Sequence, residues 1–196
     1  VSIGVESMKE RQFRGVVRQQ YDFSCGSAAV ATLLSYHYER DVSELAVFQA
    51  MYRHGDRARI REAGFSMLDM KRYLEANGYQ ADGFRVPLTK LKQVGVPAIV
   101  LTNEDGYSHF VVVKGVARER VLIGDPAKGL RILPRKEFEA MWNGLVFVIR
   151  NRMQVARQHF NSDREWSRPV RAPLEAGIRD RSLADFTRSL PRRGDF

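Results

Sequence analysis

The stretch that decides the fold reads Gln19-Gln-Tyr-Asp-Phe-Ser-Cys25-Gly-Ser-Ala-Ala-Val-Ala-Thr-Leu-Leu-Ser-Tyr-His-Tyr38. After the single cysteine, small and apolar residues recur at helical spacing, which predicts a mostly buried helix over about 25–39. A cysteine in the first turn of a helix lies beside unpaired backbone N–H groups and the positive end of the helix dipole, and both stabilise a thiolate. Cys25 is therefore a candidate nucleophile, and the alternative is a buried cysteine that acts as a small apolar core residue.

Outward from this helix, the first half of the chain is mainly helical. Further helices are expected over 44–52, capped by Asp41 or Ser43, over 67–76, started by the capping-box pair Ser66 and Asp69, and from Pro87 through 94. The polar run 53–63 is expected to form a loop or a short turn, and 79–86 a strand.

The second half changes to strand periodicity. Strands are expected over 98–102, 108–116, 120–124, 130–133 and 144–149, with one helix over 135–142 that Pro134 opens. Because the helices come first along the chain and the strands of an antiparallel sheet follow, the sequence predicts an α+β fold, with the helical N-terminal half packed on a C-terminal sheet.

The length of 196 residues suits one domain with an appendage. We expect an N-terminal arm over 1–18, the domain over 19–150, and a basic, partly helical or extended C-terminal extension over 151–196. One cysteine excludes an internal disulfide framework and a multi-cysteine zinc site, and the four histidines match no metal spacing, so no metal and no cofactor are expected. No apolar run is long enough for a transmembrane segment.

The formal net charge of +9 has two interpretations. It can attract an anionic partner such as nucleic acid, lipid headgroups or an acidic polypeptide, or it can serve solubility and a basic tail. No nucleic-acid motif accompanies the charge, so a nucleic-acid partner is not expected. The basic extension could bind an acidic partner or close over the cleft. The chain opens with Val1, and a periplasmic location after loss of a signal peptide is expected, with the cytoplasm as the alternative. The oligomeric state is left open.

Three more residues complete a candidate catalytic set. His109 lies near the start of one predicted strand and Asp125 at the end of the next, so an antiparallel hairpin would bring them together. Gln19 supplies a neutral amide donor suited to an oxyanion. A nucleophile, a base, an orienting carboxylate and an oxyanion donor are what thiol catalysis needs. The alternatives are a polar strand end for His109 and a turn-starting Asp-Pro for Asp125.

Three motifs in order carry a resemblance to a known family: Gln19-Gln-Tyr-Asp-Phe-Ser-Cys25-Gly-Ser-Ala-Ala, His109-Phe-Val-Val-Val-Lys-Gly and Gly124-Asp125-Pro126-Ala-Lys-Gly129. Over roughly 15–150 the chain resembles peptidase family C39, papain-like bacterial peptidases that cut leader peptides after a Gly-Gly pair. The resemblance implies a papain-like fold, Cys25 as nucleophile, His109 as base and acid, and Asp125 as orienter. It also implies an oxyanion hole made by Gln19 and the Cys25 backbone N–H.

Substrate contacts are expected from the residues that flank the nucleophile. Tyr21, Phe23 and Gly26 are the candidates for binding substrate, although the two aromatic rings could instead anchor the loop. Many family members have Asp directly before the cysteine, whereas this chain has Ser24 there and Asp22 three positions before, which leaves the role of Asp22 open. The chain is most similar to the free-standing C39-like proteases of bacterial functional-amyloid (Fap) secretion systems.

We therefore expect a cysteine endopeptidase that cleaves a peptide or protein substrate, after small residues such as Gly-Gly, with secretion-system components as further partners. The main alternative is a catalytically silent C39-like module that binds peptides for a secretion system. A third option is an acyl or amide transferase on the same fold, because papain-like folds host these too.

Overall fold

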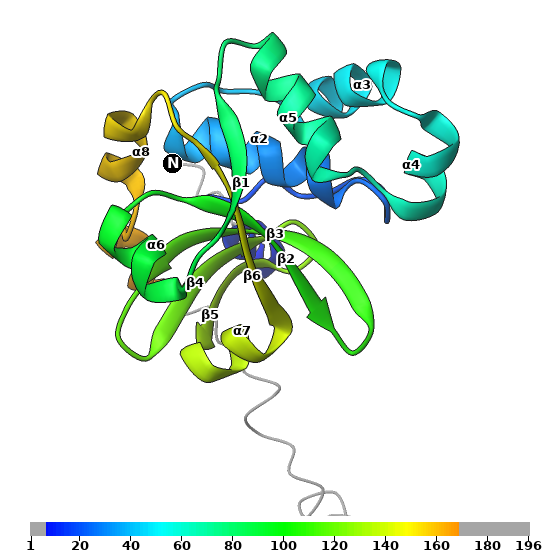
Figure 1. The fold of residues 1–196 in the computed structure, drawn as a ribbon. Coiled ribbons are helices and arrows are strands. Elements are labelled where there is room, and N and C mark those ends of the chain that lie inside the picture. The colour runs from blue at the N-terminus through cyan, green and yellow to red at the C-terminus, as the bar shows by residue number, and fades with distance from the viewer. Residues whose placement is uncertain (1–6, 169–196) are drawn as a thin grey trace, which may run out of the picture.

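The computed structural model describes residues 7–168 and places helix α2 (Cys25–His37) against one face of an antiparallel sheet (Figure 1). Small residues fill the first turns of α2, and its buried residues run from Cys25 to Leu34 with His37 added in the last turn. A helix that is buried almost all round needs small side chains so that neighbouring elements can approach its backbone. The predicted helix over 25–39 is thus confirmed within two residues.

Three more helices build the layer around α2, and each begins at a side-chain cap. They are α3 (Glu44–His54), α4 (Arg57–Ala63) and α5 (Met67–Ala76), capped by Ser43, Asp56 and Ser66. The expectation of a loop over 53–63 is wrong. Asp56 accepts hydrogen bonds from the backbone N–H groups of Ala58 and Arg59, and the fully buried Ile60 anchors the short α4 to the core.

The sheet has six strands in the order β1-β6-β2-β3-β4-β5, all neighbours antiparallel. The strands are β1 (Ala81–Arg85), β2 (Ala98–Glu104), β3 (Tyr107–Val116), β4 (Arg120–Asp125), β5 (Gly129–Pro134) and β6 (Trp142–Ile149). The predicted strands are confirmed with small shifts at their ends. The α+β fold is confirmed as well.

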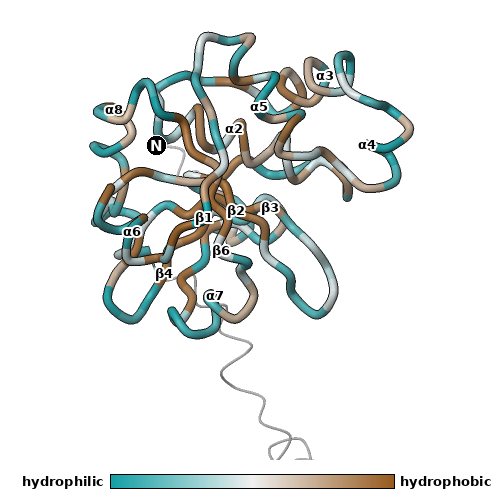
Figure 2. Tube along the Cα trace, in the orientation of Figure 1, coloured by the Kyte–Doolittle hydropathy of each residue, from teal (hydrophilic) through white to brown (hydrophobic). Residues whose placement is uncertain are grey.

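Both faces of the sheet are covered, which explains the continuous apolar runs in β2 and β3 (Figure 2). On one face Ile99, Phe110 and Val112 join the core built with α2, α3 and α5. On the other face Val111 and Val113 pack with α6 (Leu88–Val94) and α7 (Arg135–Met141). Neighbouring residues along β3 therefore serve different cores, and the strand is held rigidly.

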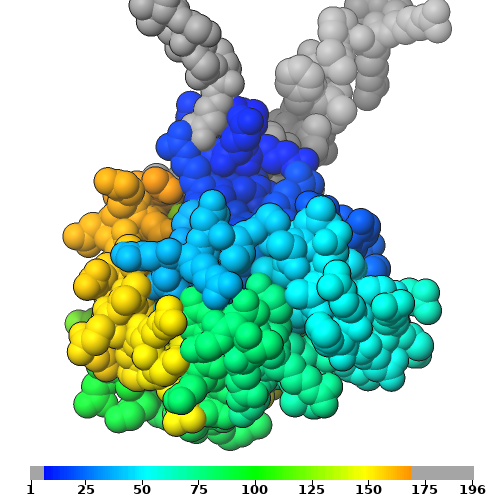
Figure 3. Space-filling view, turned by 90° about the horizontal axis from the view of Figure 1, so that it is seen from above, coloured from blue at the N-terminus to red at the C-terminus, as the bar shows by residue number. Residues whose placement is uncertain are grey.

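The chain on either side of this unit also packs onto it. Helix α1 (Met8–Gln12) leads to the buried Val16, while α8 (Met153–His159) and α9 (Asp163–Trp166) follow the expected boundary at residue 150. Seen from above, the segment that follows α1 and the C-terminal end of the described chain lie near one another (Figure 3), and Glu165 of α9 lies beside Gly15. Ala156 and Phe160 are buried, so this part of the extension belongs to the packed structure. The proposed partner-binding or cleft-closing role of the tail falls mostly on residues 169–196, which lie outside the described residues. Within 7–168, no helix combines the length and apolar character needed to cross a bilayer.

Candidate active site

Cys25 is the first residue of α2, and a tight loop delivers the chain to it. The backbone N–H of Tyr21 donates to Oγ of Ser24 at 3.1 Å, and the Ser24 hydroxyl donates back to the Tyr21 carbonyl at 3.0 Å. Ser24 is completely buried, so it holds the loop instead of facing a substrate. The sulfur therefore lies at a helix N-terminus in a chain that has one cysteine, as the sequence predicts.

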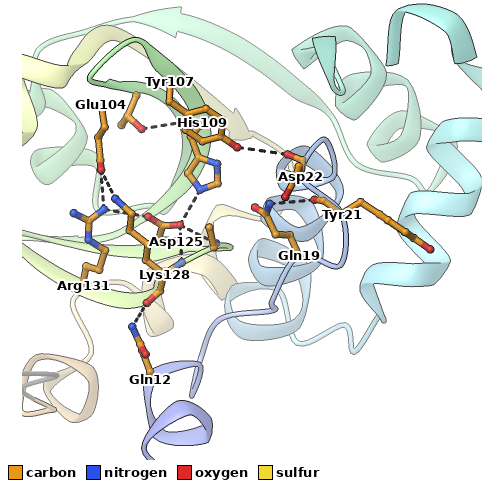
Figure 4. A network of polar contacts seen from close by, with 12 residues as sticks. Gln12, Gln19, Tyr21, Asp22, Glu104, Tyr107, His109, Asp125, Lys128 and Arg131 are labelled. Atoms are coloured by element: carbon orange, nitrogen blue, oxygen red, sulfur yellow. Dashed lines mark hydrogen bonds and ion pairs between the residues drawn. The ribbon is translucent and has the colours of Figure 1, made fainter. Parts of the chain in front are cut away.

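His109 and Asp125 meet through the predicted hairpin of β3 and β4 (Figure 4). Nε2 of His109 is 2.8 Å from Oδ1 of Asp125, and the two side chains are 7% and 1% exposed. The carboxylate oxygen accepts, so Nε2 carries the hydrogen. Nδ1 of His109 is buried and has no hydrogen-bond partner among residues 7–168, which leaves it as the ring nitrogen available to a reacting group.

The imidazole is basic because of its two neighbours. Burial by itself would lower the pKa of His109, but the hydrogen bond to Asp125 and the interaction with the Cys25 sulfur outweigh it and raise the pKa from 6.5 to about 9. For Asp125, burial would raise the pKa, but the bonds from His109 and from backbone N–H groups lower it. At neutral pH the arrangement therefore favours an imidazolium between a carboxylate and a sulfur.

Gln19 lies at the same end of the molecule, tied to the Asp125 turn. Its backbone N–H donates to the Pro126 carbonyl at 3.0 Å, which joins residues 19–24, the loop before the candidate nucleophile Cys25 (the nucleophile loop), to the β4–β5 connection. Its side-chain Nε2 donates to the Tyr21 carbonyl at 3.1 Å, and its Oε1 is buried without a partner in the described part of the chain. An amide nitrogen carries two hydrogens, so one donor of Gln19 remains for an oxyanion.

The aromatic candidates form one cluster beside the nucleophile loop. The Tyr21 ring stacks on Phe23 at 5.7 Å between centroids and lies 5.3 Å from Phe48. Tyr21 is 46% exposed, and its side chain points away from His109 and Asp125 (Figure 4), so the ring anchors the loop and its contact with substrate stays a prediction. Gly26 is buried, and a Cβ on it would come 2.9 Å from Cβ of Phe65. The structure thus gives Gly26 a packing role, and its contact with substrate stays a prediction.

Two groups near the site were missed by the sequence reasoning. Tyr107 stacks on the His109 imidazole at 5.7 Å, and its hydroxyl donates to the Asp22 carbonyl at 3.5 Å. Residues two apart in a strand share a face, so its spacing from His109 could have indicated this contact. Arg131 reaches Oδ2 of Asp125 at 3.1 Å from the neighbouring strand, a contact that depends on sheet register and leaves no local signal.

The helical layer packed on an antiparallel sheet, with Cys25 at a helix start and His109 bonded to Asp125, defines the class of fold: that of the papain-like cysteine peptidases. Among residues 7–168 no group of three or more His, Cys, Asp or Glu side chains could hold a metal ion. The model of the Peptidase C39 family matches residues 14–154. The chain belongs to the Peptidase C39 family.

Two Pseudomonas relatives are similar over most of this chain. A protein of Pseudomonas aeruginosa described as a probable functional amyloid protease, FapD, is 47% identical over 145 residues, which are 74% of this chain and 64% of that protein. Its counterpart from Pseudomonas fluorescens is 46% identical over the same shares. The chain thus spans 64% of the length of these curated relatives.

Solved peptidase domains share the architecture. The peptidase domain of Streptococcus ComA, a transporter of a quorum-sensing pathway, superposes with a TM-score of 0.58 at 20% identity and covers 68% of this chain and 96% of that one. A double glycine motif protease from an AMS/PCAT transporter, solved with its leader peptide, gives a TM-score of 0.56 at 28% identity over 68% and 89%.

Proposed function

We propose that this protein cleaves peptide bonds with Cys25 as nucleophile, His109 as general base and acid, and Asp125 as the orienting carboxylate. One observation carries the proposal: the buried His109 imidazole is hydrogen-bonded through Nε2 to a buried carboxylate and keeps Nδ1 without a partner among the described residues, and the only cysteine of the chain contributes to the raised pKa of that imidazole. This is the connected line of groups that a thiol nucleophile requires.

The steps follow from the placement of the protons. The Cys25 sulfur gives its proton to Nδ1 of His109, and the thiolate attacks the carbonyl carbon of the scissile bond. The oxygen takes the negative charge and is stabilised by the free N–H of Gln19 and by the backbone N–H at the start of α2. As the C–N bond breaks, His109 returns a proton to the leaving amine. Water, deprotonated by His109, then hydrolyses the thioester and restores the thiol.

We further propose that the substrate is a protein or leader peptide cut after small residues such as Gly-Gly. The leader-peptide complex of the 28% identical double glycine motif protease supports this substrate class. The relatives described as functional amyloid proteases support a place in an amyloid secretion system. A periplasmic location stays a prediction.

The test is cleavage of a panel of peptides with Gly-Gly, Ala-Ala and Leu-Leu at the central bond, followed by mass spectrometry of the fragments. We expect the wild type to cut the Gly-Gly peptide best, and Cys25→Ala to cut none. A thiol-directed warhead should label the wild type faster than His109→Ala. Equal labelling of the two together with no cleavage would instead support the silent peptide-binding module, and a product that carries a transferred group would support a transferase.

A further inference from the structure

The second oxygen of the Asp125 carboxylate is held by an ion-pair network that the proposed chemistry leaves unexplained (Figure 4). Nη1 of Arg131 lies 3.1 Å from Oδ2 of Asp125 and 2.7 Å from Oε1 of Glu104. The Arg131 side chain is 22% exposed and that of Glu104 27%, so water screens these charges only in part. A single guanidinium therefore joins two carboxylates from different strands.

The turn that follows Asp125 is fastened to the same network. Oδ1 of Asp125 accepts the backbone N–H groups of Ala127 at 2.9 Å and Lys128 at 3.1 Å. The Lys128 ammonium pairs with the second oxygen of Glu104. On the other side, Nε2 of Gln12 donates to the Lys128 carbonyl at 2.5 Å. With Oδ1 and Oδ2 both engaged, the carboxylate plane has one orientation.

We propose that Arg131, anchored by Glu104, is a positioning residue that keeps Oδ1 of Asp125 aimed at His109 and offsets part of the carboxylate charge that the imidazole experiences. The inference rests on the proposed function only for its effect on turnover. Its electrostatic part concerns His109 alone and can be measured in a protein that cuts nothing.

The direction in which each neighbouring charge changes the proton affinity of His109 follows from its sign. Cys25 in α2 and Asp125 in β4 act on His109 directly. Tyr107 in β3 stacks on its ring and bonds the backbone of Asp22 in the nucleophile loop. Behind Asp125, the ion-pair network consists of Arg131 in β5, Glu104 in β2 and Lys128 in the turn. Removing the Arg131 charge leaves three carboxylates, of Asp22, Glu104 and Asp125, with one lysine, so His109 should hold its proton to higher pH. Removing the Glu104 charge leaves two cations with two carboxylates, so His109 should release its proton at lower pH.

The experiment follows the His109 titration by NMR of the imidazole in Arg131→Gln, Arg131→Lys and Glu104→Gln. Arg135→Gln is the matched control, because Arg135 also forms an ion pair, with Glu139 at 2.9 Å, and is 27% exposed. We expect Arg131→Gln to raise the midpoint by roughly half a pH unit or more, Glu104→Gln to lower it by a similar amount, and Arg131→Lys and the control to stay near the wild type.

Turnover supplies the positional readout. Arg131→Gln should lower kcat by about tenfold and leave KM within about twofold, since the residue bonds Asp125 and not the substrate. Should Arg131→Gln fail to fold, Glu104→Gln carries the test, because it removes no group from Asp125. The inference is overturned if the His109 midpoint moves in the same direction in Arg131→Gln and Glu104→Gln. It is also overturned if the midpoint of Arg131→Gln equals that of the control Arg135→Gln. If the His109 midpoint moves in opposite directions in Arg131→Gln and Glu104→Gln, but the wild-type protein cuts no peptide, the electrostatic inference is upheld and the proposed function is refuted.

Discussion

Nε2 of His109 lies 2.8 Å from Oδ1 of Asp125, while its other ring nitrogen is buried and has no hydrogen-bond partner within residues 7–168. The two residues are 16 positions apart and meet because β3 and β4 form a hairpin. A histidine that uses one nitrogen to be oriented and keeps the other for chemistry has a fixed tautomer. Nε2 thus fixes the orientation of the ring, and Nδ1 is left for a reacting group.

Asp125→Asn should move the alkaline limb of the pH profile. The carboxylate helps raise the pKa of His109 to about 9, so the imidazolium form persists up to that pH in the wild type. With a neutral amide at position 125, the midpoint of the alkaline limb should move down toward pH 6.5. The amide should also lower kcat/KM by roughly 10²–10⁴-fold. The measurement is kcat/KM against pH, and Asp105→Asn, in an exposed turn, is the control. An unchanged alkaline limb in Asp125→Asn would show that this pair does not set the basicity of the imidazole.

Tyr107 should restrict which substrates reach the sulfur. Its ring covers the His109 imidazole, its hydroxyl bonds the Asp22 carbonyl, and it is 52% exposed, so it spans the space between β3 and the nucleophile loop (Figure 4). Tyr107→Ala should therefore accept larger residues at the cut site. We expect the ratio of kcat/KM for Gly-Gly over Ala-Ala peptides to fall by about tenfold.

The matched variant for this prediction is Tyr107→Phe, which keeps the ring and loses the hydroxyl. It should keep the wild-type preference, because the ring provides the obstruction. If Phe and Ala change the ratio equally, the hydrogen bond to Asp22 matters instead of the ring, and the steric explanation is wrong.

Local patterns predicted much of this fold because the signals are themselves local. The capping pair Ser66 and Asp69, the helical spacing after Cys25 and the apolar strands around His109 act within a few residues. The α4 helix was missed because its stability comes from Ile60, whose burial depends on the tertiary fold.

The ionic partners escape sequence reasoning for a related reason. Arg131 pairs with Ile123 in the β4–β5 register, and it reaches Asp125 only because that register places it beside the end of β4. A shift of one residue would turn Arg131 to the other face of the sheet. The sequence shows which residues can ionise, but the register decides which of them meet.

Glu44→Gln should stabilise the protein at neutral pH. Glu44 is 3% exposed, its Oε1 accepts from the Ser27 hydroxyl at 2.8 Å, and its Oε2 is buried without a partner among the described residues. Burial raises the pKa of Glu44, more than the bonds from Ser27 and Ser24 lower it. A carboxyl whose pKa is raised by folding weakens stability as pH rises through that value, because the folded state must then bury a charge.

The measurement for Glu44 is the melting temperature of both proteins at several pH values. The gain from Glu44→Gln should be present at pH 7 and should shrink toward pH 4, where the wild-type carboxyl is protonated. Glu75→Gln, on an exposed residue of α5, is the control. If Glu44→Gln raises the melting temperature equally at both pH values, then the amide improves packing and the ionisation of Glu44 does not destabilise the folded protein.

Lys114 and Glu165 should couple the C-terminal helices to the sheet that carries His109 and Asp125. The Lys114 side chain in β3 is fully buried, its Nζ lies 2.5 Å from Oε1 of Glu165, and it also donates to the Gly15 carbonyl. Burial lowers the pKa of Lys114, against the opposing effect of Glu165. Glu165→Gln leaves a buried ammonium without its counter-charge, and we expect it to lower the free energy of unfolding by about 3 kcal/mol.

Lys114→Met leaves the Glu165 carboxylate, 12% exposed, without its counter-charge, so it should also lower stability, and adding Glu165→Gln to it should recover part of the loss because no unpaired charge remains. Urea unfolding measures all three variants, with Glu139→Gln as the control because its ion pair with Arg135 is far more exposed. If Glu165→Gln costs no more than the control, then α9 is attached by its apolar contacts, such as Trp166 against Gly115, and the buried ion pair does not hold it to the sheet.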